Sequence, residues 1–96
     1  MLYDRPEFLK EIEETIVQVK QALEAREKGV PGDGTVEELQ KIKLNLERMR
    51  DEVASDTLPS KANRVSSMGW IITDTWSLRS LLGDRIIGVE HKYRKL

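Results

Sequence analysis

The stretch Gly29-Val30-Pro31-Gly32-Asp33-Gly34 separates two long segments in which apolar residues recur at alternating steps of three and four. This spacing places apolar side chains on one face of an α-helix. Glycine and proline stop helices, and so short a connection between two long helices makes the second fold back along the first. The sequence therefore predicts an antiparallel helical hairpin at the start of the chain.

The first helix is predicted to run from about residue 6 to 28. Pro6 suits a first helical turn because its missing N–H would be unpaired there anyway, and Gly29 suits a left-handed residue that ends the helix. The apolar face contains Phe8, Leu9, Ile12, Ile16, Val19, Ala22 and Leu23.

The second helix is predicted over residues 36–54. Thr35 and Glu38 have the spacing of a capping box, in which each side chain accepts the backbone N–H of the other residue. The apolar face contains Leu39, Ile42, Leu46, Met49 and Val53.

The third helix is predicted over about residues 60–76, with Ser60 as its N-cap. Its spacing rests on Leu58, Ala62, Val65, Gly69, Ile72 and Trp76. A short strand over residues 69–76 is the competing interpretation, because this stretch is rich in β-forming residues, although a lone strand would have no partner. Gly69 lies on the apolar face, which indicates close approach of a neighbouring helix, for example against Trp76 or Tyr93.

The fourth helix is predicted to follow Ser80 and to cover residues 81–96. Its apolar face contains Leu82, Ile86, Val89, Tyr93 and Leu96. Four amphipathic helices in one chain indicate an all-α protein, a small four-helix bundle beginning with the hairpin and forming a single domain over residues 1–96. A chain of 96 residues is long enough to bury its own core.

The composition and the apolar runs indicate in which compartment the protein is expected. The chain has no cysteine, which excludes disulfides, thiolate metal sites and a cysteine nucleophile. The N-terminus has no apolar signal core, and the longest apolar run, residues 68–72, is far shorter than the roughly 20 residues of a membrane span. We therefore expect a cytoplasmic protein without a membrane segment.

The two halves of the chain differ in charge. Residues 1–55 hold nine Lys and Arg against thirteen Asp and Glu, a net charge of −4, whereas residues 56–96 hold seven against four, a net charge of +3. This asymmetry can favour packing of one half on the other, or it can present two surfaces of opposite sign. The favoured interpretation is that the two halves simply have solvated helix faces that differ in charge.

Known site chemistries find little support in the sequence. A carboxylate-bridged di-metal site in a bundle needs Glu-x-x-His pairs, but the only histidine, His91, follows Gly88 at that spacing. Residues 32–35 lack the Lys-Ser/Thr of a phosphate loop, and adjacent acids such as Glu13 and Glu14 diverge around a helix. We therefore predict no catalytic, cofactor-binding or metal-binding residue.

The predicted helices do not explain the position of Trp70, a large apolar residue that falls outside the apolar face. Trp76 belongs to the apolar face and is predicted to lie in the core, whereas Trp70 falls among small polar residues. It is either covered by another part of the chain, such as Leu2-Tyr3, or offered to a partner as an anchor. The hypothetical partner-binding surface comprises Trp70, Ser66, Ser67, Asp74 and Met68.

These features favour a non-enzymatic protein–protein interaction module. One form is a bundle that self-associates, since the first hairpin has a coiled-coil-like apolar stripe. Another is a bacterial immunity or antitoxin-type protein. It is suggested only by format, since such proteins are often small, cysteine-poor, helical and acidic on the binding face. The alternative is a nucleic-acid-associated accessory protein that uses the basic C-terminal half. Its candidate contacts are Lys61, Arg64, Arg79, Arg85, Lys92, Arg94 and Lys95.

Overall fold

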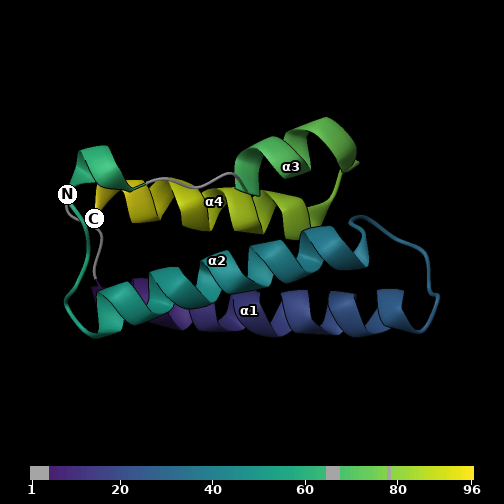
Figure 1. Ribbon diagram of the computed structural model, residues 1–96, viewed down its shortest axis with the longest axis horizontal. Coiled ribbons are helices and arrows are strands. Elements are labelled where there is room, and N and C mark those ends of the chain that lie inside the picture. Colours follow the sequence, from purple (N-terminus) through teal and green to yellow (C-terminus); the bar gives the residue numbers. More distant parts are fainter. Residues whose placement is uncertain (1–4, 65–67, 78) are drawn as a thin grey trace.

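The computed structural model describes residues 5–64, 68–77 and 79–96, which contain four α-helices and no strand (Figure 1). Helices α1 and α2 lie side by side as the predicted hairpin, α4 lies along this pair, and α3 packs on α4. The all-α bundle is confirmed, and the alternative of a strand over residues 69–76 is wrong. The helices are α1 (Arg5–Glu27), α2 (Val36–Ala54), α3 (Met68–Thr75) and α4 (Leu81–Lys95), with a 3-10 turn η1 (Lys61–Asn63) between α2 and α3.

The hairpin forms as its apolar faces require. Gly29 has φ +83°, the left-handed conformation expected after α1. At the start of α2 the Thr35 hydroxyl accepts the Glu38 N–H at 3.1 Å, and the Glu38 carboxylate accepts the Thr35 N–H at 3.0 Å, so the capping box is confirmed. The buried apolar residues of the two helices are Phe8, Ile12, Ile16, Val19, Leu23, Leu39, Ile42, Leu46, Met49 and Val53.

Arg26 organises the turn between α1 and α2. Its guanidinium donates to three carbonyl oxygens of the turn, those of Val30 at 3.1 Å, Asp33 at 3.1 Å and Gly34 at 3.2 Å. Since backbone carbonyls in a turn have no helical partner, one side chain satisfies three acceptors that would otherwise need water. The turn is thereby held in one conformation by the last turn of α1.

Charge pairs join α4 to α1. Arg85 lies 2.8 Å from the carboxylate of Glu14 and donates to the hydroxyl of the buried Thr15 at 3.1 Å. Lys92 lies 2.9 Å from Glu11, on the preceding turn of α1. Higher residue numbers on α4 therefore meet lower numbers on α1, so the two helices are antiparallel. Helix α4 of the basic half thus packs on α1 of the acidic half, as in the first interpretation of the charge asymmetry and not in the favoured one of merely solvated faces.

The third predicted helix differs most from the structure. Instead of one helix over residues 60–76, one turn of 3-10 helix is followed by Arg64 in a non-helical conformation (φ −83°, ψ 85°), and α3 begins at Met68. The Ser60 side chain makes no cap hydrogen bond. The Arg64 guanidinium donates to the carbonyls of Pro59 at 2.8 Å and of Tyr93 at 3.4 Å, contacts with the chain before η1 and the end of α4 that sequence spacing does not reveal.

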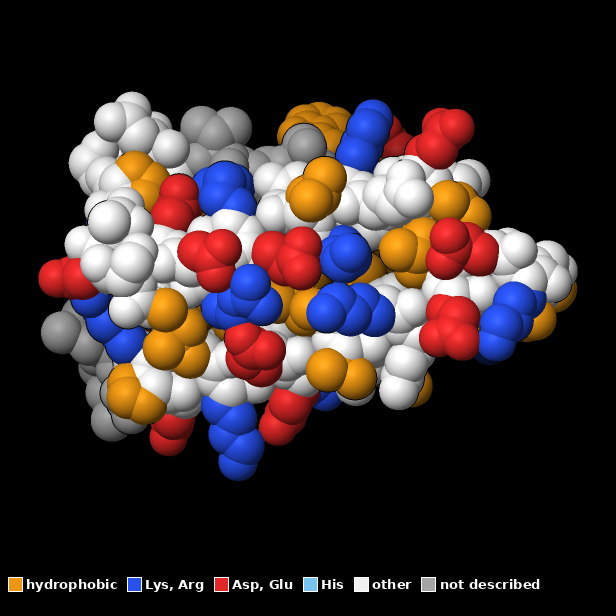
Figure 2. Space-filling view, turned by 60° about the horizontal axis from the view of Figure 1, so that its bottom comes forward, with side chains coloured by type: hydrophobic (Ala, Val, Ile, Leu, Met, Phe, Trp, Pro, Cys, Tyr) orange, Lys and Arg blue, Asp and Glu red, His pale blue; other side chains and the backbone are white. Residues whose placement is uncertain are grey.

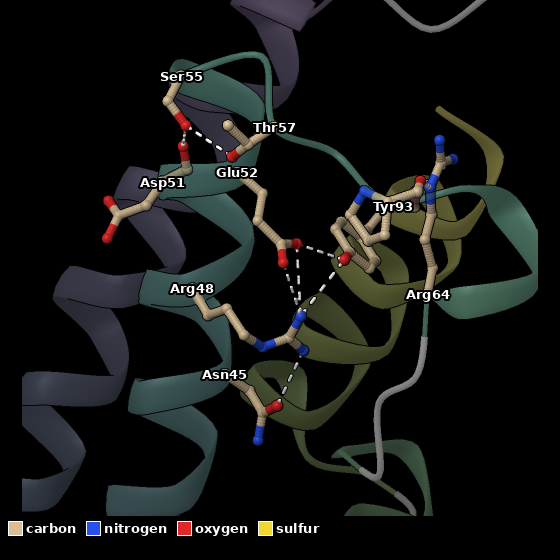
Figure 3. A network of polar contacts seen from close by, with 9 residues as sticks. Asn45, Arg48, Asp51, Glu52, Ser55, Thr57, Arg64 and Tyr93 are labelled. Atoms are coloured by element: carbon tan, nitrogen blue, oxygen red, sulfur yellow. Dashed lines mark hydrogen bonds and ion pairs between the residues drawn. The ribbon is translucent and has the colours of Figure 1, made fainter.

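Tyr93 connects α4 to α2 through a polar network (Figure 3). Its side chain is fully buried, and its hydroxyl donates to the Glu52 carboxylate at 2.5 Å. The Arg48 guanidinium lies between Glu52, at 3.3 Å, and the side-chain oxygen of Asn45, at 3.2 Å, and it donates to the Tyr93 hydroxyl at 3.4 Å. Burial and the Glu52 hydrogen bond raise the pKa of Tyr93, and Arg48 opposes this shift.

The capping box gives the first prediction. Thr35→Ala should lower the free energy of unfolding by about 1 kcal/mol, because the Glu38 N–H loses its acceptor at the start of α2. Urea denaturation followed by circular dichroism measures the change. Lys41→Ala, an exposed substitution in the middle of α2, is the control and should change stability by less than about 0.5 kcal/mol. Equal stability of Thr35→Ala and wild type would contradict the prediction.

The Tyr93 network gives a pH-dependent prediction. Because the folded state raises the pKa of Tyr93, its neutral form stabilises the fold below the ordinary value of 10.0, and this contribution is lost as pH rises through the folded pKa. Tyr93→Phe should cost about 1 kcal/mol at neutral pH through the lost hydrogen bond. This difference from wild type should narrow above about pH 10 in urea titrations. A difference that stays constant up to that pH would show that Tyr93 does not titrate with unfolding.

Candidate functional site

The two tryptophans lie in opposite environments. Trp76 is 5% exposed and belongs to the core, as predicted, whereas Trp70, on the first turns of α3, is 74% exposed. Leu2 and Tyr3, the possible cover for Trp70 within the chain, lie outside the described residues. Among the described residues, therefore, none buries Trp70, and three quarters of its surface is exposed.

A shallow pocket of about 250 Å³ lies beside Trp70 between α3 and α4. Helix α3 contributes one side of the lining and α4 contributes the other. The lining residues, here called the Trp70 pocket, are Gly69, Trp70, Thr73, Glu90 and Arg94.

Gly69 and Glu90 form the floor of the Trp70 pocket. A Cβ atom at Gly69 would lie 2.9 Å from Oε1 of Glu90, so any larger residue would require the carboxylate to shift. The other carboxylate oxygen accepts the Gly69 N–H at 3.2 Å. A negative charge at a helix N-terminus is favourable because the first N–H groups of a helix have no helical partner. The close approach expected at Gly69 is thus present, but its neighbour is Glu90 and not Trp76 or Tyr93.

Arg94 forms the rim. One of its guanidinium nitrogens lies 3.5 Å from Oε1 of Glu90, one turn earlier on α4. The two side chains differ in exposure, since Arg94 is 50% exposed and Glu90 only 8%. The carboxylate is therefore covered, while the guanidinium reaches the surface beside the indole of Trp70.

The other predicted partner-binding residues have different outcomes. Met68 is fully buried in the core, so placing it on the surface with Trp70 is wrong: at the start of α3 its side chain points to the hydrophobic core. Asp74 is exposed one turn after Trp70 on α3. Ser66 and Ser67 lie outside the described residues.

Sequence reasoning missed Glu90 as a site residue and considered Arg94 only for nucleic acid. Glu90 follows Ile86 by four residues and Val89 by one, so it lies beside the apolar face of α4. A carboxylate in that position is expected to be partly buried and to need a hydrogen-bond donor or a cation from another part of the chain. Its partner, the start of α3, could not be identified without the packing of the two helices.

The basic residues of the C-terminal half are largely engaged with the protein itself. Arg64, Arg85, Lys92 and Arg94 each contact a carbonyl or carboxylate of the chain. Figure 2 shows acidic and basic side chains interspersed over the face in view, with hydrophobic side chains in small patches between them.

The described residues contain neither a cluster of metal-binding side chains nor a membrane-spanning helix. Nowhere in residues 5–64, 68–77 and 79–96 do three or more His, Asp or Glu side chains gather in a way that could hold a metal ion. None of the helices in these ranges has both the length and the apolar character of a membrane span.

The sequence matches no protein-family model and no curated protein. Any statement about function therefore depends on the residues themselves.

The contrast between the two tryptophans gives a matched pair of variants. Trp76→Ala should lower the free energy of unfolding by about 3–5 kcal/mol, because it removes a large buried side chain from the core. Trp70→Ala should change stability by less than about 1 kcal/mol, since most of the indole already lies in water. Urea denaturation followed by circular dichroism compares both with wild type. A large loss of stability in Trp70→Ala would mean that the indole is covered.

Proposed function

We propose that the protein is a non-enzymatic interaction module that binds another protein through the surface around the Trp70 pocket. The observation that supports this proposal is the exposed indole of Trp70 beside the pocket between α3 and α4. Tryptophan and arginine are the residue types most enriched among those that dominate binding energy at protein interfaces. Here both line one pocket, with Arg94 at its rim.

The size of the pocket favours a macromolecular partner over a small ligand. Pockets for small molecules and cofactors usually measure roughly 300–1,000 Å³ and bury most of the ligand. The Trp70 pocket measures about 250 Å³ and is shallow. Such a volume suits one side chain of a partner protein, with the rest of the partner lying on the surrounding surface.

The sequence suggests two more specific versions of this proposal. The partner is a second copy of the chain in a self-associating bundle, or it is a toxin-like protein neutralised by an immunity or antitoxin protein. Neither form has a motif of its own here, so the proposal is made at the level of protein binding. The absence of cysteine is consistent with a reducing compartment, and we propose the cytoplasm as the location.

Nucleic-acid binding through the C-terminal half is the second hypothesis, with less support. Affinity for nucleic acid comes chiefly from Lys and Arg that neutralise phosphates. Four of the seven basic candidates contact groups of the protein itself. Binding a phosphate would require each of them to share or give up such a contact.

Affinity capture from a lysate of the source organism tests the protein-binding proposal. At least one protein should be retained by wild type and lost with Trp70→Ala. Leu81→Ala is the matched control, since Leu81 is also an exposed apolar residue, 85% exposed, at the start of α4. The retained protein should then bind purified wild type and fail to bind purified Trp70→Ala. Identical sets of captured proteins from all three baits would contradict the proposal.

A further inference from the structure

The Trp70 pocket presents a positive charge to a partner even though its ion pair is neutral. Glu90 is 8% exposed and lies under the surface, and Arg94 is 50% exposed at the rim. A partner approaching from solvent therefore meets the guanidinium before the carboxylate. Charge complementarity then favours an acidic group on the partner.

The guanidinium is also suited to a second carboxylate. An arginine side chain carries five N–H donors in a planar fork and can bind more than one acceptor. The Glu90 carboxylate, itself positioned by the Gly69 N–H at 3.2 Å, orients Arg94 from below. Less side-chain entropy is lost on binding when the arginine is already oriented.

The exposed side chains on the two sides of the pocket differ in charge. On the last two turns of α4 the exposed side chains are those of His91, Arg94 and Lys95, and none of them is acidic. On α3 the exposed acid is Asp74, one turn beyond Trp70. A carboxylate of the partner is thus attracted toward the α4 side of the indole and repelled from the α3 side.

We infer that the Trp70 pocket binds an acidic segment of a partner protein, in which an apolar side chain packs against the indole of Trp70 and a neighbouring Asp or Glu pairs with Arg94. This inference rests on the proposed function, because it specifies what kind of protein segment the pocket takes. It assigns Trp70 the role of apolar anchor and Arg94 the role of charge selector.

Random peptides displayed on phage provide the probe. The library is selected on wild type and depleted on Trp70→Ala, so that the recovered peptides depend on the indole. We expect these peptides to share an apolar or aromatic residue close to Asp or Glu. One of them is then synthesised, and its dissociation constant is measured by fluorescence anisotropy at low and moderate salt.

The pairing of Arg94 with the peptide is tested by a double-mutant cycle. Arg94→Gln should raise the dissociation constant roughly tenfold to a hundredfold, the usual range for a hydrogen bond to a charged group. Replacing the acidic residue of the peptide by its amide should have a similar effect. The combined change should weaken binding little more than either change alone, because both remove the same contact. Trp70→Ala should weaken binding roughly thirtyfold or more.

Lys95→Gln is the matched control, since it removes one positive charge from the same helix end without altering the pocket lining. It should change the dissociation constant by less than about threefold at moderate salt, where exposed charges are screened. Unfolding in urea checks that Arg94→Gln remains folded. An effect of Lys95→Gln as large as that of Arg94→Gln would mean that general charge, and not the rim arginine, selects the peptide.

Different results overturn different claims. Recovery of no Trp70-dependent peptide would overturn both the proposed function and this inference. Trp70-dependent peptides that are neutral or basic, or additive effects in the cycle, would overturn only the acidic-segment inference. Two other occupants would also overturn it: single-stranded DNA bound at low salt in a Trp70- and Arg94-dependent way, or a dimer in light scattering that Trp70→Ala dissociates.

Discussion

Each long helix of this protein has only one apolar face, and this constraint requires α4 to lie along the α1/α2 hairpin. A two-helix hairpin leaves part of both apolar faces in water, and α4 covers them with its own apolar face. Ile86, Val89 and Tyr93 are all fully buried there. Because hydrophobic burial is the main favourable term in folding, the positions of the other polar and charged groups follow from this packing.

Packing α4 on α1 also determines where the charges go. The acidic helix and the basic helix pair across their contact, at Arg85 with Glu14 and at Lys92 with Glu11. Partly exposed pairs of this kind add little stability, but they favour one relative orientation of the helices. They also occupy cations of the C-terminal half. On the face shown in Figure 2, acidic and basic side chains are interspersed.

Helix α3 contributes both to the core and to the surface proposed for binding. It is short, and it is held on α4 by burial of Met68 and Ile72 and by the hydrogen bond from the Gly69 N–H to Glu90. With its buried side turned to α4, the helix leaves Trp70 on its outer side. The contact that fixes α3 also positions Arg94, so one carboxylate links the packing of the fold to the surface proposed for binding.

Local sequence determined the elements whose causes are local. The hairpin, its capping box, the left-handed Gly29 and the burial of Leu39, Ile42 and Trp76 follow from spacing and turn chemistry within a few residues. Only the tertiary structure shows that the chain is not helical at Arg64. Its guanidinium donates to the carbonyls of Tyr93 and Arg94, which are distant in sequence. The pocket beside Trp70 likewise joins residues about 20 apart in sequence, and helical periodicity carries no information on which faces of two helices meet.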